Sequence, residues 1–160
     1  MTSSSGSALE NPSISRSEVE QVLRSVMQSL TDSEEGFWEL GEEVKDPSLR
    51  RYFLEESSMR TQFRSELEAV LLQEGFDDTR EHGTVAGALN RAWGEFKSAL
   101  GGSDHTLLVT AEKGEDQMME AYRKAFEKEL PYPVQQLFAA QAGHVEASHN
   151  YIRAARDSTK

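Results

Sequence analysis

The 160-residue sequence contains no cysteine. This excludes disulfides, thiolate zinc sites, iron–sulfur clusters and cysteine nucleophiles, and it is typical of a protein from a reducing compartment. Only four prolines interrupt the chain, and no run approaches the roughly 18 apolar residues that a membrane span needs. We therefore expect long uninterrupted elements, a cytoplasmic location and no membrane partner.

Basic residues are scarce: 17 lysines and arginines stand against 28 acidic residues, which gives a formal net charge of −11. A chain this acidic repels polyanions, so we expect no nucleic-acid partner. The hydrophobic residues amount to 37%, enough for one folded domain at this length. Residues 1–15 are rich in serine and lack the features of a secretory signal, so they are interpreted as a flexible tail before a single domain at 16–160.

In the first half of that domain, apolar residues recur every three or four positions, which is the spacing of a helix with one buried face. The first predicted helix covers residues 17–44, and Ser17 with Glu20 forms a predicted capping box at its start. A second helix is predicted to begin at Pro47 and to end at Gly75.

The same spacing continues in the second half of the chain. A third long helix is predicted to begin at Ser103 or Asp104 and to end near Glu129, and a fourth follows Pro131. A shorter helix is predicted over residues 84–100, between the second and third long helices. Because no stretch alternates with a period of two, the predicted fold class is all-α.

The lengths of the three connections between the long helices predict the topology. The first and third are short, and the second is long. The long helices pair as antiparallel hairpins, and the long connection with its short extra helix is typical of a ferritin-like four-helix bundle. Trp93 and Phe96 on the short helix either cap the bundle or meet a partner, and a homo-oligomer such as a dimer is expected on this interpretation.

Polar residues on the predicted buried faces of the helices are the candidate functional residues. Glu56, Glu115 and His149 fall on predicted inward faces, and Glu146 precedes His149 by three positions. A buried carboxylate needs a cation, a proton, a hydrogen-bond donor or water. Glu-x-x-His is the spacing that di-iron and di-manganese bundles use. Glu112 lies at a similar predicted level of the third helix.

The predicted metal ligands are therefore Glu112, Glu115, Glu146 and His149, with Glu34 and Glu56 as weaker candidates, and the implied cofactor is iron or manganese. The alternative is a hydrogen-bonded Glu–His pair in a wet part of the bundle. Met59 stands where a symmetric site would have histidine, so the sequence offers half of a di-metal site. His144 is interpreted as a surface residue, and Glu56 with Arg60 as a solvated i, i+4 pair.

Several motifs together resemble the bacterial domain of unknown function 2383 family, a set of ferritin-like four-helix proteins. The motifs are Asp32–Phe37, Val44–Leu49, Met59–Phe63, Gly83–Trp93 and Glu112–Asp116. The resemblance covers residues 17–157 and implies the fold without implying a reaction. Asn90 stands where the family pattern has histidine.

Three functional hypotheses follow. The first is a non-catalytic bundle, with a stress-associated or interaction role, that has no complete di-metal centre. The second is an iron- or manganese-binding protein that uses the half site. The third extends the second to di-iron oxidase or peroxidase chemistry, which the resemblance to the wider ferritin-like class implies. No catalytic residue is assigned.

Overall fold

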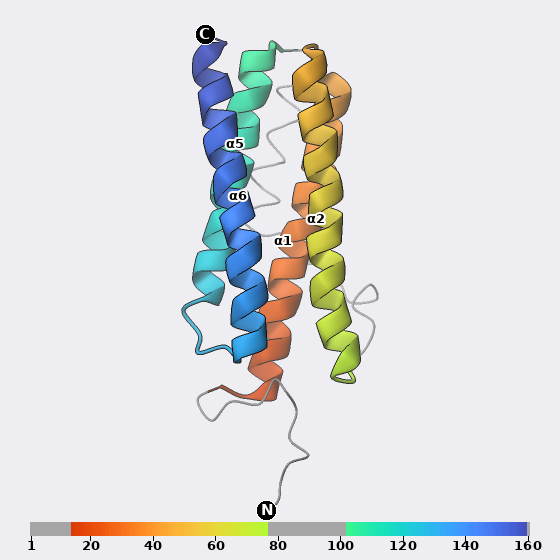
Figure 1. Ribbon diagram of the computed structural model, residues 1–160, viewed down its shortest axis with the longest axis vertical. Coiled ribbons are helices and arrows are strands. Elements are labelled where there is room, and N and C mark those ends of the chain that lie inside the picture. The colour runs from red at the N-terminus through yellow and green to blue at the C-terminus, as the bar shows by residue number, and fades with distance from the viewer. Residues whose placement is uncertain (1–13, 77–101, 160) are drawn as a thin grey trace, which may run out of the picture.

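The computed structural model describes residues 14–76 and 102–159, and these form four helices without a β-strand. The helices are α1 (Arg16–Glu43), α2 (Pro47–Gln73), α5 (Asp104–Ala125) and α6 (Tyr132–Ser158), and they lie side by side along one axis (Figure 1). The all-α prediction is confirmed for the described residues. The predicted helix at 84–100 and most of the predicted tail at 1–15 lie outside them.

The N-cap of the first helix lies two residues before the predicted one. Ser15 is the N-cap: its Oγ accepts a hydrogen bond from the backbone N–H of Glu18, and its own N–H donates to the Glu18 carboxylate. The predicted box of Ser17 and Glu20 was therefore wrong. Both serines are followed by glutamate at the third position, so the pattern cannot distinguish them. The choice depends on the extended backbone of Ser15 (φ −78°, ψ 156°).

The predicted starts and ends of α2 and α5 largely agree with the structure. α2 starts at Pro47, and Gly75 follows its end with φ +87°, a left-handed conformation that glycine adopts without strain. Ser103 caps α5 by accepting from the N–H of Thr106. α5 ends at Ala125, four residues before the predicted end near Glu129.

Contacts at the two ends of the bundle define how the chain runs. Asp104, at the start of α5, accepts hydrogen bonds from the backbone N–H groups of Lys45 and Asp46 between α1 and α2, at 2.9 and 3.0 Å. At the opposite end, the guanidinium of Arg16 at the start of α1 donates to the carbonyl of Glu74 after α2. α2 therefore stops at one end of the bundle, and α5 begins at the other (Figure 1).

The helices pack closely within each hairpin, α1 with α2 and α5 with α6, and also between α1 and α5, whereas α2 and α6 approach one another less closely. The core is apolar and all four helices contribute to it. Its fully buried members include Val19, Leu23, Leu30, Phe37, Leu40, Phe53, Leu67, Leu71, Leu108, Met118, Val134, Phe138, Val145 and Ile152. None of the four described helices combines the length and apolar character needed to cross a bilayer.

We predict that Asp104→Ala lowers the free energy of unfolding by about 1–2 kcal/mol, because it leaves two backbone N–H groups in the joint between α1 and α2 without their charged acceptor. Urea denaturation followed by circular dichroism measures the change. Glu127→Ala is the control, since it removes only an exposed ion pair with Arg123. Equal stability of the two variants would contradict the prediction.

Candidate functional site: a buried arginine–carboxylate cluster

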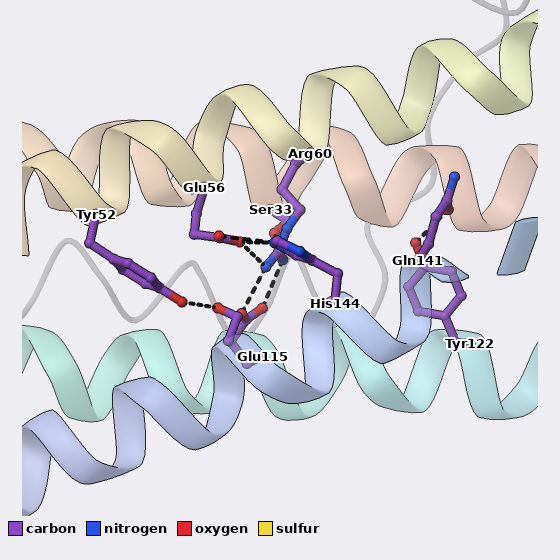
Figure 2. A network of polar contacts seen from close by, with 9 residues as sticks. Ser33, Tyr52, Glu56, Arg60, Glu115, Tyr122, Gln141 and His144 are labelled. Carbon is purple, nitrogen blue, oxygen red and sulfur yellow. Dashed lines mark hydrogen bonds and ion pairs between the residues drawn. The ribbon is translucent and has the colours of Figure 1, made fainter. Parts of the chain in front are cut away.

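A charged cluster lies in the middle of the bundle, with Arg60 of α2 at its centre (Figure 2). Arg60 and Glu115 have no exposed surface, and Glu56 is 5% exposed. The two terminal nitrogens of Arg60 donate to the two oxygens of Glu115, both at 2.8 Å. Nη2 also donates to Glu56 at 2.7 Å, and Nη1 donates to the Ser33 hydroxyl at 2.9 Å. Arg60 therefore connects α2 to α5 and to α1.

Helical spacing explains why a charged residue enters the core here. Phe53, Glu56, Arg60, Phe63 and Leu67 are separated by steps of three and four, and all five are buried on α2. The prediction that Glu56 faces inward is confirmed. The interpretation of Glu56 and Arg60 as a solvated pair was wrong, because both members of this i, i+4 pair share the buried face.

The electrostatics of the cluster keep Arg60 charged. Burial by itself would lower the pKa of Arg60, but attraction and hydrogen bonding to Glu115 and Glu56 outweigh this, so the pKa is raised. The guanidinium also lies 4.9 Å from the centre of the Phe37 ring, a cation–π contact. Arg60 Nε is buried and lacks a hydrogen-bond partner among the described residues.

His144 of α6 completes the cluster. Its Nε2 lies 3.0 Å from each carboxylate oxygen of Glu56, and its ring meets the edge of Phe63 with 5.3 Å between centres. The side chain is 33% exposed, so its interpretation as a surface residue missed a contact with the core. The available signal was that inward carboxylates require cations, and Arg60 lies one helical turn from Glu56. No sequence signal distinguished His144 from the other basic residues.

Further polar contacts run along the facing sides of α2 and α6. The Tyr52 hydroxyl donates to Ser148 Oγ at 2.8 Å, and Gln141 Nε2 donates to the Phe63 carbonyl at 3.2 Å. The Tyr122 hydroxyl of α5 donates to Gln141 Oε1 at 2.7 Å (Figure 2). We call the contacts of α2 with Gln141, His144 and Ser148 the polar seam.

The four predicted metal ligands have different surroundings. The carboxylate of Glu115 accepts hydrogen bonds from Arg60, while Glu146 is exposed to solvent. Glu112 and His149 do lie near each other, with 3.7 Å between Oε2 and Nε2. His149 Nε2 is closer to Asp116, at 2.7 Å, and Glu112 pairs with Arg156.

The weaker candidates are also engaged by arginines: Glu34 pairs with Arg64 at 2.6 Å, and Glu56 pairs with Arg60. Within residues 14–76 and 102–159, no group of three or more His, Asp or Glu side chains is placed to hold a metal ion. The six predicted ligands therefore do not fit a single metal centre as they are arranged, and no reaction step through a metal is derived from them.

The chain matches the family described as Domain of unknown function (DUF2383) over residues 18–128. It belongs to the DUF2383 family. The matched region contains Ser33, Glu56, Arg60 and Glu115, whereas His144 and the rest of α6 follow it. A search of the curated proteins found no match.

We predict that Arg60→Met destabilises this DUF2383 protein by about 3–5 kcal/mol, because Glu56 and Glu115 would remain buried without their cation. Arg64→Met is the matched control. Arg64 lies one turn further along α2 and pairs with Glu34, and each of these two side chains is 29% exposed. Its removal should therefore lower the free energy of unfolding by no more than about 1 kcal/mol. Chemical denaturation measures both, and similar losses would show that the buried cluster contributes no more than a surface pair.

Alkaline pH should also destabilise the bundle. Burial raises the pKa of Tyr122 and of Tyr52 well above the usual value, which is about 10 in an unfolded chain. Above that pH the unfolded state loses protons that the folded state retains, so the stability present at lower pH is lost as the pH rises. We predict a smaller loss between pH 9 and 11 in Tyr122→Phe than in the wild type, measured by urea denaturation at each pH. An unchanged slope would contradict the prediction.

Proposed function

We propose that this DUF2383 protein is a non-catalytic ferritin-like bundle with a structural or interaction role, whose interior charge is neutralised by arginine instead of a metal ion. The observation that carries the proposal is the Arg60 guanidinium, which has no exposed surface and donates to both Glu56 and Glu115. These carboxylates are the inward ones on α2 and α5, where a metal centre in the bundle core would need its ligands.

The path of the chain supports the ferritin-like part of the proposal. α1–α2 and α5–α6 form two hairpins, and α2 ends at the end of the bundle opposite to the start of α5. A four-helix bundle with one long crossover between its hairpins has this arrangement. A simple up-and-down bundle would instead begin its third helix beside the end of its second.

A direct test is elemental analysis of untagged protein, before and after anaerobic loading with Fe(II) or Mn(II) and removal of free metal. We predict far less than one retained ion per chain, because the interior carboxylates are already paired. Retention of about two ions per chain, the content of a di-metal bundle, would overturn the proposal. Iron-dependent consumption of oxygen or peroxide would overturn it as well.

A second candidate is a protein that binds one divalent ion near His149. It is favoured by the approach of His149 Nε2 to Asp116 at 2.7 Å and to Glu112 at 3.7 Å. Arg156 competes for Glu112 in this arrangement. Retention of about one ion per chain that is lost in His149→Ala would favour this candidate over the first.

A further inference from the structure

An open pocket beside an exposed tryptophan lies on the surface of the α1–α2 hairpin. It has a volume of about 260 Å³ and is lined by Glu34, Glu35, Trp38 and Glu39 of α1 and by Ser57 of α2. We call it the Trp38 pocket. Trp38 is 55% exposed although its neighbour Phe37 is fully buried, because consecutive residues of a helix point about 100° apart. A large aromatic side chain exposed beside a pocket is typical of a binding surface.

The polar side chains of the Trp38 pocket are nearly all hydrogen-bond acceptors. Ser57 is 7% exposed, and its Oγ donates its hydrogen to the Glu34 carbonyl at 2.9 Å. The hydroxyl therefore offers only its lone pairs to the pocket. The carboxylates of Glu35 and Glu39 are exposed and have no ion pair within the described part of the chain. Apart from the indole N–H of Trp38, these side chains can only accept, so a ligand rich in donors matches them.

The pocket lies within a strongly acidic stretch of α1. Residues 25–44 contain no lysine or arginine and six acidic residues, Asp32, Glu34, Glu35, Glu39, Glu42 and Glu43. The last four of these are exposed and share one side of the helix, which we call the acidic face. Like charges at this spacing destabilise a helix, so a cationic partner would relieve a cost that the chain bears alone.

Two neighbouring carboxylates show how far this charge is neutralised. Glu34 is paired with Arg64 at 2.6 Å, so it adds little net charge to the pocket. Asp32 has a raised pKa, chiefly because it is half-buried and in smaller part because of the negative charge of Glu35. Glu35 and Glu39 therefore supply the uncompensated charge that a ligand in the pocket would meet.

An arginine side chain has the properties that this pocket requires. Its guanidinium is positively charged and has five N–H donors and no acceptor. It stacks on the face of an aromatic ring, and it forms strong hydrogen bonds to carboxylates. Trp38 supplies the aromatic surface, and Glu35 and Glu39 supply the carboxylates.

The surroundings of the pocket favour a segment of a protein over a free small cation. Ion pairs and cation–π contacts at exposed sites are individually weak, so stable binding needs several of them at once. Glu42 and Glu43 lie one helical turn beyond Glu39 on the acidic face and can pair with further basic residues of the same segment. A second copy of this chain is a poor match, because its net charge is −11.

We propose that the Trp38 pocket and the acidic face form a docking surface for an arginine-bearing segment of a partner protein. One guanidinium of the segment stacks on the indole of Trp38 and pairs with Glu35 and Glu39, and further basic residues pair with Glu42 and Glu43. This inference rests on the proposed function, whose interaction role it gives a surface and a partner chemistry.

The test titrates the full-length protein with a hexa-arginine peptide with blocked ends, at physiological ionic strength, by isothermal titration calorimetry. Trp38→Ala should weaken binding at least about threefold, although it leaves the net charge unchanged. Tyr132→Ala is the matched control, because it removes another exposed aromatic side chain that does not line the pocket. It should bind the peptide as tightly as the wild type. Equal affinities of Trp38→Ala and the wild type would overturn the proposal.

A second pair of variants separates docking from general attraction between opposite charges. Glu35→Gln/Glu39→Gln should weaken peptide binding at least about fivefold, because two carboxylates of the pocket are lost. Glu129→Gln/Glu146→Gln removes the same charge from two exposed positions outside α1 and should have a clearly smaller effect. Equal losses in the two double variants would show diffuse attraction and refute the docking surface. Circular dichroism confirms that each variant is folded.

The wild-type protein offers a measurement that needs no substitution in the test sample. In two-dimensional NMR spectra, the peptide should shift the indole N–H resonance of Trp38, which is assigned by its absence in Trp38→Ala, and the amide resonances of residues 34–43. A Trp38 resonance that stays unmoved at saturating peptide would contradict the proposal. So would light scattering that shows a wild-type dimer and a Trp38→Ala monomer, because the occupant would then be a second copy.

The two proposals fail in different experiments. Retention of about two metal ions by a protein that also binds the peptide through Trp38 would contradict the proposed function and leave the docking surface in place. A protein that retains no metal and binds the peptide equally well without Trp38 would overturn the docking surface alone.

Discussion

The packing of the bundle interior depends on one buried cation. Arg60 has no exposed surface, and its guanidinium connects the carboxylate of Glu56 on its own helix to that of Glu115 on α5 and to Ser33 on α1. The arrangement is stable only as a set, since each carboxylate is costly to bury without the guanidinium and the guanidinium is costly without them. It therefore restricts how α1, α2 and α5 can be positioned relative to one another.

The polar seam adds a second restriction, on the position of α6 relative to α2. α2 and α6 approach less closely than the helices of either hairpin, and side-chain hydrogen bonds such as Tyr52 to Ser148 and Gln141 to the Phe63 carbonyl connect them. Such bonds have narrow geometric requirements, whereas apolar contacts tolerate sliding. The seam thus fixes the register of α6 against α2 and brings His144 to Glu56.

The same cluster explains why a carboxylate pattern typical of metal bundles need not imply a metal centre. Inward glutamates require neutralisation, and a divalent ion or a guanidinium can each provide it. Glu115 was correctly predicted to lie in the core, but its partner is Arg60. Glu146 and His149 share one helix, yet Glu146 is exposed and His149 is turned to Asp116.

The sequence by itself determined the four long helices, the start of α2 at Pro47, the glycine after its end, and the inward position of Glu56 and Glu115, because these depend on local backbone preferences and on the helical period. It could not determine which residues meet across helices. The Ser15 cap, the burial of Arg60 and the contact of His144 with Glu56 were decided by tertiary packing. Partners across a bundle depend on the rotation and axial register of each helix, and these result from all the packed side chains together.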